Sequence, residues 1–111
     1  MKTDISDLQA TYSKLRSRLK NVGWISQGYV QDRGPGAGGP HYQWTRKVQA
    51  KTVSVALSKE QYDWLKQAIS NWRQLQDTLV EMQQLSRKVL FQTLPNPPRR
   101  KRLSKKVLGI N

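Results

Sequence analysis

The feature that most constrains this fold is a long stretch, residues 59–93, that contains neither glycine nor proline. Ser58 and Gln61 open it as a capping box, in which each side chain can accept a backbone N–H that the first helical turn leaves unpaired. Apolar residues then recur at helical spacing. We therefore predict one continuous helix over residues 59–93, which would be about 50 Å long at the usual rise per residue.

A second helix is expected near the N-terminus, over residues 3–22. Thr3 or Asp4 can cap its first turn, and Gly23 is suited to end it. Its apolar residues recur at alternating spacings of three and four, the narrow seam of a helix that pairs with another helix. The expected partner is the second half of the long helix, from the same chain or from a second copy. The predicted pairing residues are Leu8, Tyr12, Leu15 and Leu19 on the first helix and Trp72, Leu75, Leu79 and Met82 on the long one.

Three stretches between the helices have the composition of strands: residues 24–31, 41–48 and 52–57. They are rich in the β-branched and aromatic residues that suit a pleated, half-buried surface. The short link at 49–51 favours an antiparallel hairpin, and Gly28 marks a bulge or a close approach of two backbones. The predicted fold class is therefore α+β: an N-terminal helix, a three-stranded antiparallel β-meander and a long C-terminal helix, in a single domain over residues 1–94.

The last segment, residues 95–111, has a different composition. Pro95, Pro97 and Pro98 end the long helix, because proline lacks an N–H and clashes with the preceding turn. The residues that follow are strongly basic and include no acid, which predicts a disordered tail. Its cations are Arg99, Arg100, Lys101, Arg102, Lys105 and Lys106.

The net charge of +13 at pH 7 points to a polyanionic partner. No acid lies between Arg33 and Lys59, and none follows Glu81, so the chain has two acid-free basic regions. We predict that the tail contacts nucleic-acid phosphates, which adds affinity without reading sequence. The alternatives for the tail are an anchor to an anionic membrane surface or, in a eukaryotic host, a nuclear import signal. No amphipathic helix adjoins the tail to favour the membrane.

The predicted hairpin interleaves aromatic and basic residues. A two-stranded ribbon can enter a major groove, and exposed aromatic rings can stack on unpaired bases. Tyr42 and Trp44 are candidates for such stacking. The alternative, favoured by the usual burial of these residue types, is that they and Trp24 form a core beneath the long helix. The cations near the strands that are expected to contact the phosphate backbone are Arg33, Arg46, Lys47 and Lys51.

The loop "RGPGAGGP", residues 33–40, spaces Gly34, Gly36 and Gly39 as in a dinucleotide-binding fingerprint. That fingerprint requires a helix to begin inside the motif, because the helix N-terminus binds the pyrophosphate. Here Pro40 and a strand-like run follow instead. We therefore interpret the loop as a flexible link between two strands, in which glycines supply positive φ angles.

Catalysis and metal binding have little support in the sequence. The chain has one histidine, His41, and no cysteine, so it lacks the ligands of a thiolate or multi-histidine metal site. Asp77 and Glu81 are an i,i+4 pair of carboxylates that could hold Mg²⁺, but the mixed charge of that helix favours an ordinary solvated face. The chain is predicted not to be an enzyme and to carry no cofactor or metal.

Several motifs resemble a known family. They are "GYV" at 28–30, "GPHYQW" at 39–44, "KTV" at 51–53, and "LSKEQ" followed by Asn-Trp-Arg within 57–73. Together they resemble short, basic bacterial proteins of unknown function that are often encoded beside insertion-sequence transposases. Relatives often carry a cysteine-rich knuckle, suggesting zinc, between the first two strands. Because this chain has no cysteine there, a metal-binding role does not transfer.

Charge and resemblance together predict a non-enzymatic, nucleic-acid-binding accessory or regulatory protein of a mobile element. The expected partners are DNA or RNA, a transposase or another protein of the same element, and a second copy in a homodimer, with no membrane contact. The polar N-terminus does not resemble a signal peptide, so we expect a cytoplasmic location. Nucleic-acid binding in a bacterial host would place the protein at the nucleoid. The alternative is a protein-interaction or assembly module that docks on a transposase or other nucleoprotein through its long helix.

Overall fold

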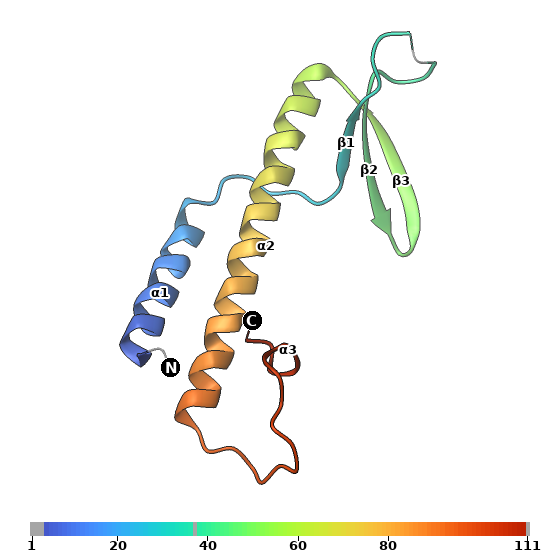
Figure 1. Ribbon diagram of the computed structural model, residues 1–111. Helices are drawn as coiled ribbons and strands as arrows, with labels where there is room; N and C mark the ends of the chain where they lie inside the picture. The colour runs from blue at the N-terminus through green and yellow to red at the C-terminus, as the bar shows by residue number, and fades with distance from the viewer. Residues whose placement is uncertain (1–3, 37, 111) are drawn as a thin grey trace. The chain divides into compact units, whose positions relative to one another are not determined.

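A computed structural model describes residues 4–36 and 38–110 of the chain (Figure 1). It confirms the α+β class, with an N-terminal helix, a three-stranded antiparallel sheet and a long helix. The elements in chain order are α1 (Ile5–Arg18), the 3-10 turn η1 (Leu19–Asn21), β1 (Tyr29–Asp32), β2 (Tyr42–Val48), β3 (Lys51–Leu57), α2 (Lys59–Thr93) and α3 (Lys105–Leu108).

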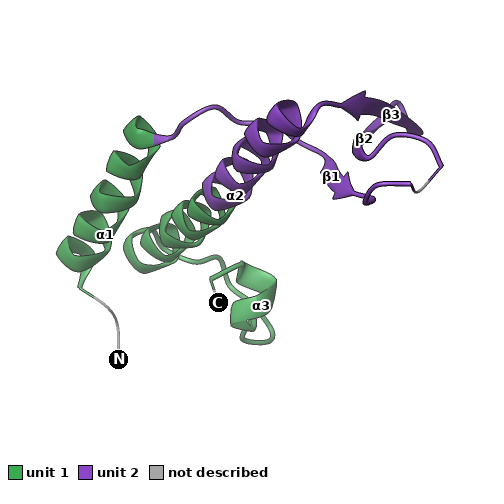
Figure 2. Ribbon diagram, turned by 90° about the horizontal axis from the view of Figure 1, so that it is seen from above, with its two compact units in different colours: residues 1–21, 76–111 green, residues 22–75 purple. Residues whose placement is uncertain are grey.

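The chain divides into two compact units (Figure 2). The terminal unit combines the described parts of residues 1–21 and 76–111, and therefore contains α1, the second half of α2 and α3. The central unit, residues 22–75, contains the sheet and the first half of α2.

The sheet of the central unit has the strand order β1-β2-β3, and both pairings are antiparallel. Since side chains alternate along a strand, the register sorts them into two faces. The aromatic face comprises Val30, Asp32, Tyr42, Trp44, Arg46, Val48, Lys51, Val53, Val55 and Leu57. The polar face comprises Tyr29, Gln31, Gln43, Thr45, Lys47, Thr52, Ser54 and Ala56.

A two-residue turn joins β2 to β3. Both of its residues have positive φ angles, 49° at Gln49 and 65° at Ala50. This is the backbone that favours a tight hairpin, although neither residue is of the type usually found there. The predicted link at 49–51 is therefore one residue too long, because Lys51 already pairs with Val48 in the sheet.

The first half of α2 contacts the aromatic face at Tyr42 and packs against the segment that precedes β1. The Tyr42 ring lies 4.9 Å from the Tyr62 ring. Ala68 and Ile69 of the same helix are only 2% and 4% exposed and form the core of the central unit. Tertiary packing of one helix face, rather than propensity, is what usually stabilises such a helix.

The first predicted strand begins five residues later than expected. The backbone before β1 bonds to α2 instead of to β2: the Ser26 N–H donates to the Ala68 carbonyl at 3.3 Å, and the Asn71 amide donates to the Trp24 carbonyl at 2.9 Å. Trp24 is consequently 75% exposed. The prediction of Trp24 as core is wrong, because the bonds to α2 hold its backbone while its ring stays open to solvent.

In the terminal unit, α1 lies along the second half of α2. Asp4 caps α1, accepting from the Ser6 N–H at 2.8 Å, and Leu8, Leu15 and Met82 are buried. The helical seam thus finds a partner within the same chain. Of the remaining predicted pairing residues in this unit, Tyr12 and Leu19 are half-buried and Leu79 is 37% exposed. Trp72 and Leu75, both half-buried, belong to the central unit.

The tail contains one helical turn, α3, where disorder was predicted throughout. Ser104 caps this turn, its hydroxyl oxygen accepting from the Val107 N–H at 3.2 Å. Gly109 ends it with a φ of 71°, a conformation that glycine adopts without strain. The Arg87 guanidinium then donates to the Gly109 carbonyl at 3.2 Å. The cap and the terminal glycine together explain why this basic segment can form a turn.

Candidate nucleic-acid interface

The cations predicted on the hairpin meet at its turn. Thr45 is the last β2 residue that pairs with β1, so beyond it β2 and β3 continue as a ribbon of two strands. We call residues 46–53 the hairpin tip. It carries Arg46, Lys47 and Lys51 and no acid. The register thus brings together three of the four cations predicted near the strands.

These three cations do not share one face. Arg46 and Lys51 belong to the aromatic face, and Lys47 belongs to the polar face. The Arg46 guanidinium lies 4.3 Å from the centre of the Trp44 ring, a cation–π contact that orients it. Both lysines are exposed. Positive charge therefore flanks the hairpin tip on both sides.

Arg33 lies at the other end of the sheet. Its backbone N–H donates to the His41 carbonyl at 2.7 Å, and its guanidinium donates to the Pro40 carbonyl at 3.5 Å. Six residues of extended chain separate His41 from Lys47, about 20 Å at the usual rise of a strand. The structure therefore does not bring Arg33 together with the hairpin tip.

The rings of Tyr42 and Trp44 already have neighbours. Tyr42 stacks on His41 with the ring centres 4.0 Å apart, in addition to its contact with Tyr62. The Trp44 indole N–H donates to the Gln27 carbonyl at 3.1 Å, and Arg46 covers its ring. Both residues are half-buried. These contacts favour a packing role over base stacking.

The glycine-rich loop joins β1 to β2, as predicted. Asp32 closes its base, since one carboxylate oxygen accepts from the Gly34 N–H at 3.0 Å and lies 2.9 Å from the His41 Nε2. Gly34, Gly36 and Gly39 all have positive φ angles. A strand rather than a helix follows the loop, so the helix terminus that a pyrophosphate site needs is absent from this place in the fold.

The predicted tail cations form a second basic cluster, in the terminal unit. All of them are exposed, and no acid follows Glu81 in the chain. Arg99, Lys101 and Arg102 line a shallow recess together with Phe91 and Leu103. The apolar side chains of this recess help to hold a segment whose charges alone would keep it extended.

Sequence reasoning missed an exposed aromatic pair in the central unit. The rings of Trp24 and Trp64 lie 6.4 Å apart, and the two side chains are 75% and 54% exposed. Two tryptophans that remain open to solvent side by side are typical of an interaction surface. The only signal in the sequence was the aromatic residue itself, because the bonds that fix Trp24 beside α2 join residues far apart in the chain.

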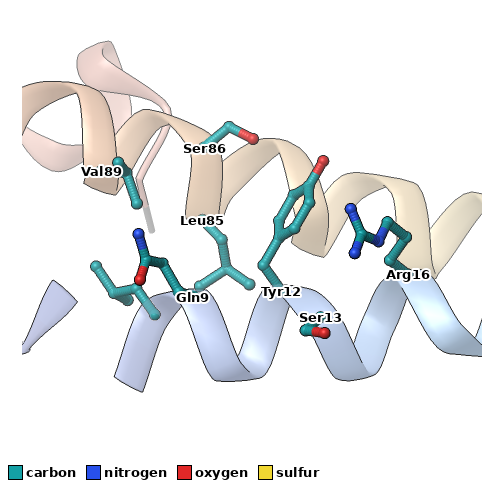
Figure 3. Close-up of a pocket in the computed structure, with 8 residues that line it drawn as sticks. Gln9, Tyr12, Ser13, Arg16, Leu85, Ser86 and Val89 are labelled. Atoms are coloured by element: carbon teal, nitrogen blue, oxygen red, sulfur yellow. The ribbon is translucent and has the colours of Figure 1, made fainter. Parts of the chain in front are cut away.

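An apolar groove of about 440 Å³ lies between α1 and α2 in the terminal unit (Figure 3). Tyr12 and Arg16 rise from α1 toward α2, and Leu85 points from α2 toward α1. Leu8 and Val89 also line the groove. Sequence periodicity predicted the helix pairing, but not that the pair would leave an apolar channel open.

Two charged side chains have shifted pKa values. Hydrogen bonds from the Ser6 hydroxyl and backbone N–H lower the pKa of Asp4. The Asp63 carboxylate, which accepts from Lys59 at 2.9 Å, raises the pKa of Lys59. Both groups cap or support a helix, and neither lies in a basic cluster.

Within residues 4–36 and 38–110, no group of three or more histidine or acidic side chains is placed to hold a metal ion. None of the described helices is long and apolar enough to cross a membrane. Comparisons of the chain with protein-family models, with curated proteins and with solved structures gave no match.

Proposed function

We propose that this chain is a non-enzymatic, nucleic-acid-binding accessory protein, as the resemblance to transposase-associated proteins implies. The observation that carries the proposal is the presence of two exposed, acid-free clusters of cations, at the hairpin tip and in the tail. A solvated surface needs a net charge of only a few units to remain soluble. The net charge of this chain, +13, is well above that, and we infer that the additional positive charge serves to bind a polyanion.

The two clusters differ in how firmly they are held. Arg46 is fixed over Trp44 on a sheet, whereas the tail residues 99–104 lie in no helix or strand. A cation held on a sheet can set the register of a bound nucleic acid, while the tail contributes affinity through counterion release. The protein would act in the nucleoid, with a transposase of the same element as its protein partner and a second copy in a homodimer.

A salt series of nucleic-acid binding tests this proposal. The full chain is titrated into labelled DNA and RNA at increasing salt, and a variant with the tail cations changed to glutamine is compared with it. We expect the affinity of the full chain to fall steeply as salt is added. The slope of log affinity against log salt concentration is expected to be smaller by up to about 5 in the variant, since each phosphate contact adds about 0.9 to it.

The matched control changes Lys14 and Lys66, which lie outside both clusters, to glutamine. This control is expected to keep the slope of the full chain. Absence of binding to any nucleic acid at about 50 mM salt, where phosphate contacts are strongest, would overturn the proposal.

The exposed tryptophan pair favours a second candidate, a protein-interaction module that docks through α2. Trp64 lies on α2 itself, and Trp24 is held beside it by the bond from Asn71. The test is calorimetric titration of the chain with the proposed partner, a transposase. Changing Trp24 and Trp64 to alanine is expected to weaken that binding at least tenfold, as for tryptophans at interface centres. Unchanged affinity would reject docking at this surface.

A further inference from the structure

We propose that the polar face of the β2–β3 ribbon reads base edges in the major groove of duplex DNA, an inference that rests on the proposed nucleic-acid function. The residues proposed to face the bases are Gln43, Thr45, Lys47, Thr52 and Ser54.

The chemistry of this face is the first support. Every one of these side chains can donate a hydrogen bond, and all but Lys47 can also accept one. The polar face carries no acid. The single acid of the sheet, Asp32, belongs to the aromatic face and is bound to His41. A surface that offers donors and one cation without any carboxylate is complementary to the electronegative floor and walls of a DNA groove.

The second support is that α2 contacts the sheet on the other face, at Tyr42. Its Tyr62 ring contacts Tyr42, and Arg46 and Trp44 contact one another on the same aromatic face. Lys47, Thr52 and Ser54 are exposed, whereas the central Gln43 and Thr45 are half-buried among their strand neighbours. The Thr45 and Ser54 hydroxyls lie 3.2 Å apart and keep each other oriented.

The third support is geometric. The major groove is about 12 Å wide and admits a two-stranded ribbon, which is what the sheet becomes beyond Thr45. Alternate residues of an antiparallel strand are about 6.8 Å apart. This is about two steps of B-DNA, whose bases rise by about 3.4 Å. Along β2, Gln43, Thr45 and Lys47 are therefore spaced to meet every second base pair. Lys47 and its cross-strand partner Thr52 lie in the two-stranded part, and Gln43 and Thr45 lie where β1 still pairs with β2.

The residue types match the donor and acceptor code of that groove. A glutamine amide pairs with adenine, a lysine donates to guanine O6 and N7, and a threonine methyl contacts the thymine methyl. Arg46 and Lys51, on the opposite face of the ribbon, are left for the phosphates that wall the groove. The major groove of duplex RNA is too deep and narrow for this arrangement.

The test begins with selection of binding sites by the full chain from a pool of random-sequence duplex DNA. Affinity for the selected site and for a scrambled site is then measured by fluorescence anisotropy. Gln43→Ala changes no charge, and is expected to reduce the ratio of the two affinities by about 5- to 100-fold, the usual cost of a lost base contact. Its salt slope is expected to equal that of the unaltered chain.

Because Gln43 is half-buried, Thr52→Ala provides a second variant at an exposed position of the same face. The matched control is Lys51→Gln, which is expected to weaken binding to both sites equally. Methylation of guanine N7, which lies in the major groove, is expected to block binding at the selected site.

The outcomes separate this inference from the proposed function. Binding that enriches no sequence, that is insensitive to Gln43→Ala and Thr52→Ala, or that is as tight for duplex RNA or single strands overturns the inference and leaves the nucleic-acid function standing. Failure to bind any nucleic acid at low salt overturns both.

Discussion

Asp4 shows how one side chain makes the start of α1 sensitive to acid. Its carboxylate accepts from the Ser6 N–H and hydroxyl, and these bonds lower its pKa below the ordinary value of 3.8. A group whose pKa is lower in the folded state contributes stability above its unfolded pKa, and the contribution is lost as the pH falls through the folded pKa. The cap is therefore fully effective at neutral pH and weakens only in acid, below the unfolded pKa.

The variant Asp4→Asn keeps a good capping residue but removes this titration. We expect the stability difference between the two proteins to be constant above about pH 5 and to shift in favour of the asparagine variant below about pH 3.8. Urea unfolding followed by circular dichroism from about pH 2 to about pH 7 measures this difference. A difference that does not change with pH would contradict the role given to the Asp4 carboxylate.

Gly28 is the glycine whose place in the fold leaves least room. Its φ is 117°, and a Cβ atom would collide with the Trp44 indole nitrogen and lie 2.9 Å from the Thr45 carbonyl oxygen. The close approach predicted from the sequence is thus present, and it permits the bond from Trp44 to Gln27.

Gly28→Ala is expected to destabilise the protein by about 2–4 kcal/mol, from backbone strain together with the clash. Gly36→Ala is the matched control, because Gly36 also has a positive φ but has nothing within 4 Å of the added methyl. Its expected cost is about 1 kcal/mol, from strain alone. Chemical denaturation gives both values, and equal costs for the two variants would show that the approach of Trp44 does not matter.

At the scale of elements, the β2–β3 turn is under local strain. Gln49 and Ala50 both have positive φ angles, which Asn-Gly adopts at lower cost. The double variant Gln49→Asn with Ala50→Gly is expected to stabilise the fold by about 0.5–1.5 kcal/mol, because the strain of an L-residue with positive φ is relieved. A higher midpoint of urea unfolding with an unchanged slope checks this. A lower midpoint would mean that the turn differs in solution.

The elements that could be predicted were those whose signals are local. Ser58 and Gln61 exchange the two hydrogen bonds of the capping box, so the start of α2 was correct. The start of β1 was not, because the Ser26 N–H bonds to Ala68, a residue distant in the sequence. α3 was missed because its cap, Ser104, lies among cations that dominated the composition of the tail.

The same distinction applies to the candidate site. Positions of cations follow directly from the sequence, and the hairpin brings Arg46, Lys47 and Lys51 to one tip. Which face is free depends on where α2 packs, and the contact of Tyr62 with Tyr42 decides it. The pairing of Trp24 with Trp64 likewise depends on a long-range bond, that from Asn71. The structure was therefore needed to show which face of the sheet is free and which tryptophans are exposed.

At the scale of the whole molecule, the two basic clusters belong to different compact units. A polyanion that engages both at once gains affinity, because the second contact is made within an existing complex. The contribution of each cluster then appears in the salt dependence, since each phosphate contact releases counterions independently of the others. The salt slope therefore reports which clusters contact the same nucleic acid.

Three variants measure this in one experiment: the tip cations Arg46, Lys47 and Lys51 changed to glutamine, the six tail cations from Arg99 to Lys106 changed likewise, and both sets combined. We expect the slope to fall by up to about 3 for the tip, about 5 for the tail and the sum for both. Circular dichroism serves as the control, because every changed side chain except Arg46 is exposed and the helix content should be preserved. A slope that the tip variant leaves unchanged would mean that the tail binds nucleic acid alone. A combined effect no larger than that of one cluster would mean that the other cluster makes no phosphate contact of its own, and a combined effect larger than the sum would mean that the two clusters compete for the same phosphates.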